Sequence, residues 1–277
     1  MTETQVADIM SSEVVTASLP GTREDVFDDL MRGEISSVPV TKDGKYRGLV
    51  SRRDMLDSPD QEQLSLLMRE VETVTPETTV EDTARTILDE GERRLPVVED
   101  SEVVGIVTVT DIVRHISETE NTENIDEYAE EEVLTVWEGT PLSTVVNSLR
   151  FGGETAACVI EGSDLVGLVS EVDCIRASDT EDVSDTVGVG LADEDDDWMW
   201  SGIKSSSSNL VPISRLRFPD DPVSEHMSGD VVKAMRSTDV SVAAERMIEN
   251  DHEQLPVVRG DSLVGILKDV NLLRAVQ

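Results

Sequence analysis

Hydrophobic and polar positions follow the same order four times along this 277-residue chain. In the second copy, an alternating stretch at residues 71–74 precedes Val80, Ala84 and Ile87, which fall at helical spacing. Two apolar runs separated by a polar turn follow. The copies superimpose without a gap at residues 14–54, 71–111, 133–173 and 231–271. An internal repeat of this kind predicts one strand–helix–strand–strand–helix unit that is used four times.

Residues that commonly cap helices stand just ahead of the apolar helical stripes. Thr22, Thr79 and Asp239 can each accept a hydrogen bond from a free backbone N–H, and Pro141 suits the same place in the third copy. The polar residues 99–102 between two apolar runs are typical of a hairpin turn. The pattern therefore predicts helices and short antiparallel strands within each repeat.

The closing residues of each copy carry a resemblance to a known family. In the second copy, Leu95-Pro96-Val97-Val98 is followed by Gly105, Thr108 and Asp111, and the other copies keep these offsets. This pattern resembles the CBS domain, and four copies resemble two tandem pairs, or Bateman modules. The four-repeat subunit of AMP-activated kinase and its archaeal look-alikes have this organisation. The resemblance implies an α+β fold of four βαββα repeats in two pseudo-twofold modules.

We expect four repeats and one unrepeated insert. At 277 residues the chain exceeds what one core usually supports, which fits two domains. The insert contains an acidic run at 193–197, typical of an exposed loop, but also Trp198 and Trp200. These rings favour a segment that folds back onto a module or a subunit contact over a free anchor for a partner. The expected boundaries are repeat 1 at 1–60, repeat 2 at 61–120, repeat 3 at 121–178, the insert at 179–221 and repeat 4 at 222–277.

The resemblance also implies which residues would bind a ligand, because paired repeats of this family commonly bind adenosine derivatives. A carboxylate at the start of the last helix can accept hydrogen bonds from vicinal ribose hydroxyls, and a Ser or Thr beside the helix N-terminus can receive a phosphate. Helix capping by the same residues is the structural alternative. The ligand-binding candidates are Thr16, Ser51, Asp54, Thr73, Arg94, Thr108, Asp111, Thr135, Ser170 and Asp173.

The second repeat is the best candidate site. Arg94 matches a basic phosphate contact of the energy-sensing relatives, whereas Ser37, Ala156 and Gln254 stand in the equivalent places. With few basic residues available, a monophosphate, or a nucleotide that shares its charge with a metal ion, is easier to accommodate than bare ATP. Three arginines lie three residues after the helix-start positions, and we favour intrahelical pairs over phosphate contacts for them: Arg114, Arg176 and Arg274.

The fourth repeat has an altered site. Asn271 can cap a helix but cannot offer a charged carboxylate to a diol, and Lys233 and Lys268 replace hydroxyl residues of the other copies. We expect this site to hold no ligand, or a lysine side chain. A phosphate bound by Lys268 is the weaker alternative.

The charge of the chain is strongly acidic. Its 59 acidic and 23 basic residues leave a formal net charge of −36. At about 1 M salt the screening length falls to ~3 Å and self-repulsion largely vanishes, which favours a halophilic cytoplasm. The same balance argues against nucleic acid and anionic lipid as partners. Since no apolar run is long enough to cross a bilayer, we expect a soluble cytoplasmic protein.

Neither a catalytic nor a metal site is predicted. His115, His226 and His252 lie far apart in the sequence, without Cys or carboxylate ligands at metal spacing. The acidic run at 193–197 could hold a cation, but an exposed loop is the favoured interpretation. We expect the two cysteines, Cys158 and Cys174, to be small buried hydrophobic residues.

The sequence favours a non-enzymatic sensor that requires no cofactor. AMP is the first candidate ligand, with ADP, ATP and S-adenosylmethionine as others. Ligand binding would favour one relative orientation of paired repeats, and a regulated protein of unknown identity would recognise it. We also expect the chain to form a homo-oligomer. The alternative is a constitutive protein–protein interaction scaffold with degenerate ligand clefts.

Overall fold

The computed structural model describes residues 3–31, 35, 37–51, 54, 61–177, 179–183 and 213–276. The acidic run at 193–197 and the tryptophans Trp198 and Trp200 lie outside these residues, so the proposed packing of the insert stays a prediction. Within the described part, no helix is both long and apolar enough to cross a membrane.

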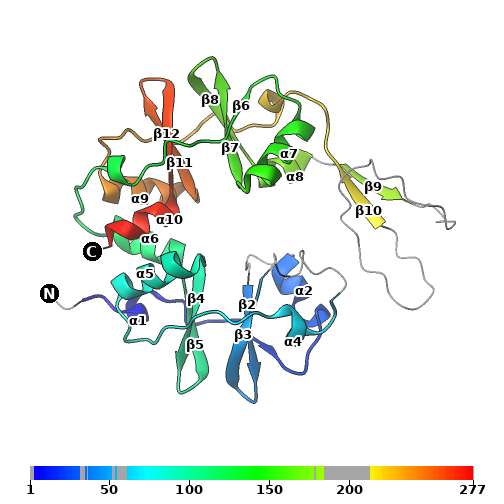
Figure 1. The fold of residues 1–277 in the computed structure, drawn as a ribbon, viewed down its shortest axis with the longest axis vertical. Coiled ribbons are helices and arrows are strands. Elements are labelled where there is room, and N and C mark those ends of the chain that lie inside the picture. The colour runs from blue at the N-terminus through cyan, green and yellow to red at the C-terminus, as the bar shows by residue number, and fades with distance from the viewer. Residues whose placement is uncertain are drawn as a thin grey trace. The chain divides into compact units, whose positions relative to one another are not determined.

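The chain forms two compact units whose limits do not follow the repeats (Figure 1). Unit 1 contains residues 1–130, 234–257 and 266–277, and unit 2 contains residues 131–233 and 258–265. Most of repeat 4 therefore joins repeats 1 and 2. The reason is helix packing inside unit 1, where α9 (Val240–Asn250) lies against α6 (Val109–Ser117).

Repeat 2 shows how the sequence pattern becomes structure. Helix α5 (Val80–Glu90) precedes the antiparallel strands β4 (Arg94–Glu99) and β5 (Glu102–Thr108), and α6 follows. The opening strand expected at 71–74 is reduced to one parallel bridge between Val74 and Val97. The turn between β4 and β5 places Asp100 and Ser101 at φ 50° and 72°, the left-handed conformation that tight hairpins require.

The start and the buried face of α5 are those expected from the sequence. Thr79 is the N-cap and its side chain accepts a hydrogen bond from the Asp82 N–H, while Gly91 ends the helix at φ 67°. Val80, Ala84 and Ile87 are buried. Asp239 is the N-cap of α9 as expected, but its side chain makes no capping bond; the Glu123 and Asn121 carbonyls accept the N–H groups of Val240 and Ser241 at the start of the helix.

Repeat 1 supplies a separate core of unit 1. The sheet order is β1-β2-β3, with β1 parallel to β2 and β2 antiparallel to β3. The buried cluster includes Val26, Leu30, Val40 and Leu64. The elements are α1 (Val6–Ile9), β1 (Ala17–Ser18), α2 (Glu24–Met31), β2 (Ser37–Lys42), β3 (Lys45–Ser51) and α4 (Leu64–Leu67).

The remaining elements of repeat 4 and its flanks follow the same plan. In repeat 4 they are β11 (Gln254–Arg259), β12 (Ser262–Lys268), α10 (Asp269–Leu272) and η3 (Leu273–Ala275), while η1 (Ile125–Glu127) lies near the start of repeat 3. Helix α10 packs on α6 and α9, all within unit 1.

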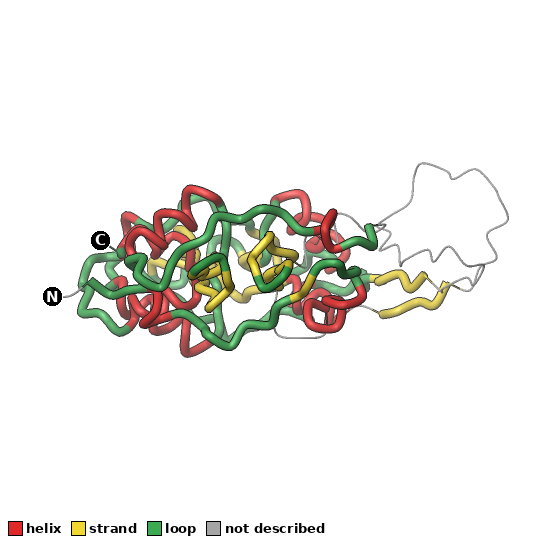
Figure 2. The backbone as a smooth tube through the Cα atoms, turned by 90° about the horizontal axis from the view of Figure 1, so that it is seen from below, coloured by secondary structure: helices red, strands yellow, loops and turns green. Residues whose placement is uncertain are grey.

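Unit 2 is built around repeat 3. Strand β7 pairs in parallel with β6 and antiparallel with β8. Strand β9 pairs antiparallel with β10, and these two strands are the yellow pair at the right of Figure 2. Cys158 and Cys174 are buried, as predicted, and are not joined in a disulfide; burial raises the pKa of the Cys158 thiol to about 12. The elements are β6 (Thr135–Trp137), α7 (Leu142–Gly152), β7 (Ala156–Glu161), β8 (Asp164–Ser170), α8 (Glu171–Ala177), β9 (Asp179–Val183), β10 (Ile213–Arg217) and η2 (Val223–Glu225).

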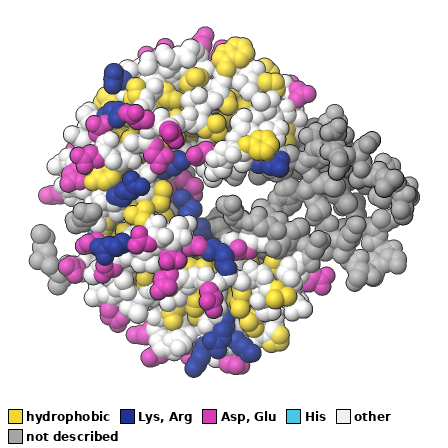
Figure 3. All heavy atoms as spheres, viewed as in Figure 1, with side chains coloured by type: hydrophobic (Ala, Val, Ile, Leu, Met, Phe, Trp, Pro, Cys, Tyr) yellow, Lys and Arg dark blue, Asp and Glu magenta, His cyan; other side chains and the backbone are white. Residues whose placement is uncertain are grey.

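Acidic side chains are spread over the face drawn in Figure 3 instead of gathering at one place. A dispersed charge of this kind is consistent with general repulsion that salt would screen.

Candidate functional site

The predicted aspartate of repeat 2 belongs to a capping box. Helix α6 begins at Val109 with Thr108 as its N-cap, so Asp111 is the third residue of the helix and not the first. Asp111 Oδ2 accepts hydrogen bonds from the Thr108 backbone N–H at 2.9 Å and from Thr108 Oγ1 at 2.7 Å. Thr108 Oγ1 in turn accepts one from the Asp111 N–H at 3.2 Å. The capping role that the sequence left open is therefore present.

Repeats 1 and 3 build the same box. Asp54 Oδ2 accepts from the Ser51 N–H at 2.8 Å and from its hydroxyl at 2.6 Å. The corresponding distances between Asp173 and Ser170 are 2.9 and 2.7 Å. Each box uses the Oδ2 oxygen and fixes the direction of the carboxylate. A second oxygen, Oδ1, remains on each aspartate for another partner.

In repeats 2 and 3 that second oxygen faces an exposed arginine of its own helix. Arg114 Nη1 lies 3.3 Å from Asp111 Oδ1, and Arg176 Nη1 lies 4.0 Å from Asp173 Oδ1. The two arginine side chains are 51% and 77% exposed, so water competes for these pairs and they contribute little. These are the intrahelical pairs that the sequence spacing favoured.

The candidates of repeat 2 meet at one end of its hairpin. Arg94 and Thr108 are direct cross-strand partners in the β4–β5 ladder. The Val74 N–H donates to the Pro96 carbonyl at 3.2 Å, which places Thr73 beside β4. Thr16 directly precedes β1 beside β2, and Thr135 opens β6 opposite Cys158. The backbone thus places Arg94 opposite Thr108, and Thr16, Thr73 and Thr135 at strands or bridges beside the hairpins of their own repeats.

The aspartate of repeat 1 has a different partner. Arg69 Nε lies 3.2 Å from Asp54 Oδ1, while Arg69 Nη2 donates to Glu92 Oε2 at 2.9 Å and Nη1 donates to Glu92 Oε1. The Asp54 and Glu92 side chains are only 18% and 19% exposed. The hydrogen bond to Glu92 raises the pKa of Arg69. Arg69 therefore joins the site of repeat 1 to repeat 2.

In repeat 4 the altered residues also have a protein partner. Asn271 Oδ1 accepts from the Lys268 N–H at 2.9 Å and so preserves the cap. Asn271 Nδ2 donates to Glu130 Oε1 at 3.0 Å, and Lys268 Nζ lies 3.4 Å from Glu130 Oε2. Lys233 belongs to unit 2, whereas Lys268 and Asn271 belong to unit 1.

A further ion pair connects repeats 2 and 4 inside unit 1. Arg93 donates to both carboxylate oxygens of Asp269, at 2.7 and 3.2 Å. The Asp269 residue is 4% exposed and begins α10, so this pair fixes the start of the last helix against β4. Arg93 was visible in the sequence as a neighbour of Arg94, but its partner lies too far away in the chain for any spacing to indicate.

Four segments match the family model described as the CBS domain, at residues 6–60, 64–118, 125–180 and 223–277. The chain belongs to the CBS-domain family. The repeat-2 site is therefore a CBS-repeat site, and the α+β architecture expected from the resemblance is confirmed.

Two solved structures cover the whole CBS-domain chain. A conserved protein from Pyrococcus horikoshii is 28% identical, with a TM-score of 0.72 over 99% of this chain and 100% of its own. Protein MJ1225 from Methanocaldococcus jannaschii, described as an archaeal homologue of the AMP-activated kinase γ subunit, has a TM-score of 0.67 at 19% identity over 99% of this chain and 100% of its own. Its sequence match is 26% identical over 62% of this chain and 69% of the relative. A second relative from that organism, MJ0188, is 33% identical, but the match spans only 43% of it and 40% of this chain.

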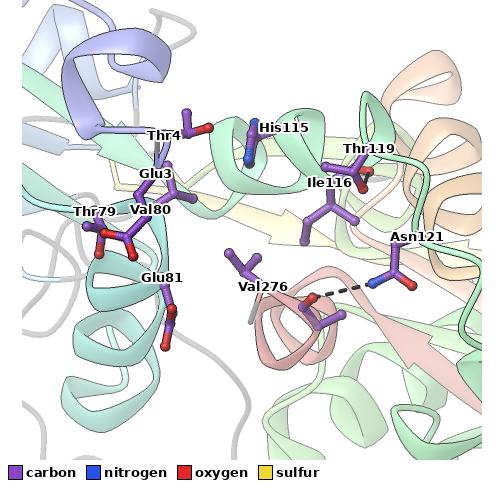
Figure 4. A pocket seen from close by; sticks show the side chains of 11 residues that line it. Glu3, Thr4, Thr79, Val80, Glu81, His115, Ile116, Thr119, Asn121 and Val276 are labelled. Atoms are coloured by element: carbon purple, nitrogen blue, oxygen red, sulfur yellow. Dashed lines mark hydrogen bonds between the residues drawn. The ribbon is translucent and has the colours of Figure 1, made fainter. Parts of the chain in front are cut away.

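A pocket of about 290 Å³ lies elsewhere in unit 1 of this CBS-domain protein (Figure 4). Thr4, Thr79, His115 and Asn121 contribute polar atoms to its wall, and Val276 contributes apolar surface. None of the predicted ligand-binding residues lines it. Within the described ranges, no group of three or more His, Cys, Asp or Glu side chains is placed to hold a metal ion.

Proposed function

We propose that this CBS-domain protein binds an adenosine nucleotide, with AMP as the first candidate, and reports its presence to another protein. The observation that carries the proposal is the fixed Asp111 carboxylate, whose Oδ2 is held by Thr108 while Oδ1 faces the exposed Arg114. A carboxylate held in this way is preorganised to accept hydrogen bonds from ribose hydroxyls.

The other candidates of repeat 2 complement a single phosphate. Arg94 supplies one positive charge directly across the strand pair from Thr108. One arginine and a helix N-terminus can balance a monophosphate, whereas a bare triphosphate would bring more negative charge into a chain of net charge −36. AMP is therefore a better candidate ligand than ATP.

Signalling would operate through the helix that carries the aspartate. Helix α6 begins at the proposed ligand contact and packs against α9 and α10. A ligand that prefers one position of α6 would shift this packing. A difference of ~1–3 kcal/mol between its binding free energies for the two arrangements suffices for ordinary coupling. The proposed role is regulatory and not enzymatic.

Thermal unfolding in about 2 M KCl with AMP, ADP, ATP or S-adenosylmethionine tests the proposal. A ligand present at 100 times its dissociation constant should stabilise the protein by about 2.7 kcal/mol. Asp82→Asn is the charge-matched control for Asp111→Asn, which removes the proposed ribose contact, because Asp82 pairs with Arg85 on an exposed helix face. Stabilisation of the wild type and of this control is expected, and a lack of any stabilisation across the four ligands would reject nucleotide sensing.

A constitutive interaction scaffold remains the second candidate function. It is favoured by the sites of repeats 1 and 4, where Arg69 and Glu130 contact Asp54 and Asn271 respectively. A lack of thermal stabilisation by all four ligands, combined with stable binding of a partner protein, would support it. We further propose that the protein is cytoplasmic and forms a homo-oligomer. Light scattering in high salt tests the assembly, and a measured mass equal to that of one 30.3 kDa chain would reject it.

A further inference from the structure

Four segments, each just ahead of one of the superimposing stretches at 14–54, 71–111, 133–173 and 231–271, approach the strands in the same way. In each, one residue forms an isolated antiparallel bridge with a strand of another repeat. For Arg69 and Leu49 the two backbone hydrogen bonds are 2.9 and 3.0 Å long, and the other three pairs make the same two bonds at 2.8 to 3.0 Å. We call the first member of each pair the facing residue. The pairs are Ser11 with Ile106, Arg69 with Leu49, Glu130 with Ile266, and Ser228 with Leu168.

Glycine in the strand permits this close approach. A Cβ atom built on Gly48 would lie 2.7 Å from the Arg69 carbonyl oxygen, and one on Gly105 would lie 3.1 Å from the Ser11 carbonyl oxygen. The repeated glycine that the sequence showed at Gly48, Gly105 and Gly167 therefore makes room for the facing segment.

Every facing residue lies next to a helix-start site. Its strand partner stands two residues before the N-cap, as Leu49 does before Ser51 and Ile106 before Thr108. Residues two apart in a strand share one face, so the facing side chain is directed to the neighbourhood of the cap. Two long facing side chains show this directly: Arg69 reaches Asp54 at 3.2 Å, and Glu130 reaches Asn271 at 3.0 Å.

The charges of these two facing residues match the sites they touch. Arg69 is cationic and contacts the carboxylate of Asp54. Glu130 is anionic and contacts the ammonium group of Lys268 together with the Asn271 amide. Ser11 and Ser228 are short and uncharged, and they bridge Ile106 and Leu168 on the strands that lead to the aspartates of repeats 2 and 3. The facing position therefore divides the four sites into two classes.

We propose that the facing residue decides which CBS repeats take a ligand. Arg69 and Glu130 occupy the sites of repeats 1 and 4 from within the chain, and only repeats 2 and 3, which face serine, bind nucleotide. The inference rests on the proposed function and sets its stoichiometry at two nucleotides per chain. Arg69 is also held by Glu92, so a ligand would have to displace a side chain that is anchored at its far end.

Exchange of the facing residues tests the proposal. Calorimetric titration of AMP in high salt should give two sites per chain for the wild type. Arg69→Ser, which copies the serine of repeats 2 and 3, should give three. Ser11→Arg, which copies repeat 1, should give one. Arg85→Ser is the matched control, since Arg85 pairs with Glu81 and Asp82 on an exposed helix face and its loss should leave two sites.

The outcomes separate this inference from the proposed function. Two sites in the wild type and in both exchange variants would overturn the role of the facing residue and leave nucleotide sensing intact. Failure of every protein to bind AMP or the other ligands of the panel would overturn both. Circular dichroism checks that each variant is folded. If Arg69→Ser does not fold, the number of sites in Ser11→Arg still decides the test.

The Arg69 contact is also testable without nucleotide. Its Nε–H, assigned by the loss of its NMR signal in Arg69→Ser, should exchange with water more slowly than that of Arg85, because Asp54 accepts from Arg69 Nε and the side chain is 38% exposed against 58%. Equal exchange rates would show that Arg69 leaves the site open, and would overturn the proposal.

Discussion

Replacement of Asp111 by Asn separates helix capping from ligand binding. The chain contains its own precedent, because Asn271 occupies the equivalent position and its Oδ1 accepts the Lys268 N–H at 2.9 Å. An asparagine at 111 can keep the bond to the Thr108 N–H, which is 2.9 Å long in the wild type. It cannot offer two equivalent anionic oxygens, one to the cap and one to a diol.

The two consequences have different magnitudes. The cap persists with a neutral acceptor, and the lost pair with Arg114 is exposed, so unfolding should become easier by less than about 1 kcal/mol. A hydrogen bond from a ligand to a charged group contributes about 1.5–3 kcal/mol, so AMP should bind the repeat-2 site roughly 10- to 150-fold more weakly.

Chemical denaturation and calorimetric titration in the same high-salt buffer measure the two effects. Asp82→Asn removes the same charge from an exposed helix and should change neither quantity appreciably. Unchanged AMP affinity at every site in Asp111→Asn would refute the ribose contact and leave the carboxylate with a capping role only. A destabilisation of several kcal/mol would refute the assumption that asparagine preserves the cap.

Three other outcomes are expected. The melting temperature should rise between about 0.1 and 2 M KCl, since the screening length shortens from ~10 Å to below ~3 Å; a flat or falling profile in differential scanning fluorimetry would contradict the account of the −36 charge. The pKa of Cys158 is raised from 9.0 to about 12, so native protein binds the thiol proton more strongly than unfolded protein. The free energy of unfolding, measured by urea titration, should therefore fall as pH rises above 9. If a Cys158→Ala variant shows the same decrease with pH, the thiol is excluded as its cause. Arg93→Met leaves the carboxylate of Asp269, 6% exposed, without its bidentate partner and should cost about 1–3 kcal/mol; the double variant with Asp269→Asn should recover part of it, and additive losses would argue against the pair.

Local features of the fold could be predicted because they depend on neighbours in the chain. The apolar spacing of Val80, Ala84 and Ile87 and the cap at Thr79 gave the correct course of α5. The shared offsets of Thr108 and Asp111 indicated a helix start, although Asp111 proved to be the third residue of α6. This error arises because a capping box places its acidic residue three positions after the cap, and spacing alone does not show which member opens the helix.

The sequence by itself determined the repeated unit, its helices and hairpins, and the family, because each follows from periodicities and offsets within some tens of residues. Tertiary structure decided which segment faces each site. Arg69 and Glu130 stand outside the repeated stretches, and the pairing of Arg93 with Asp269 spans most of the chain. These contacts arise when separate repeats pack and strands are bridged at a glycine, so no local pattern encodes them.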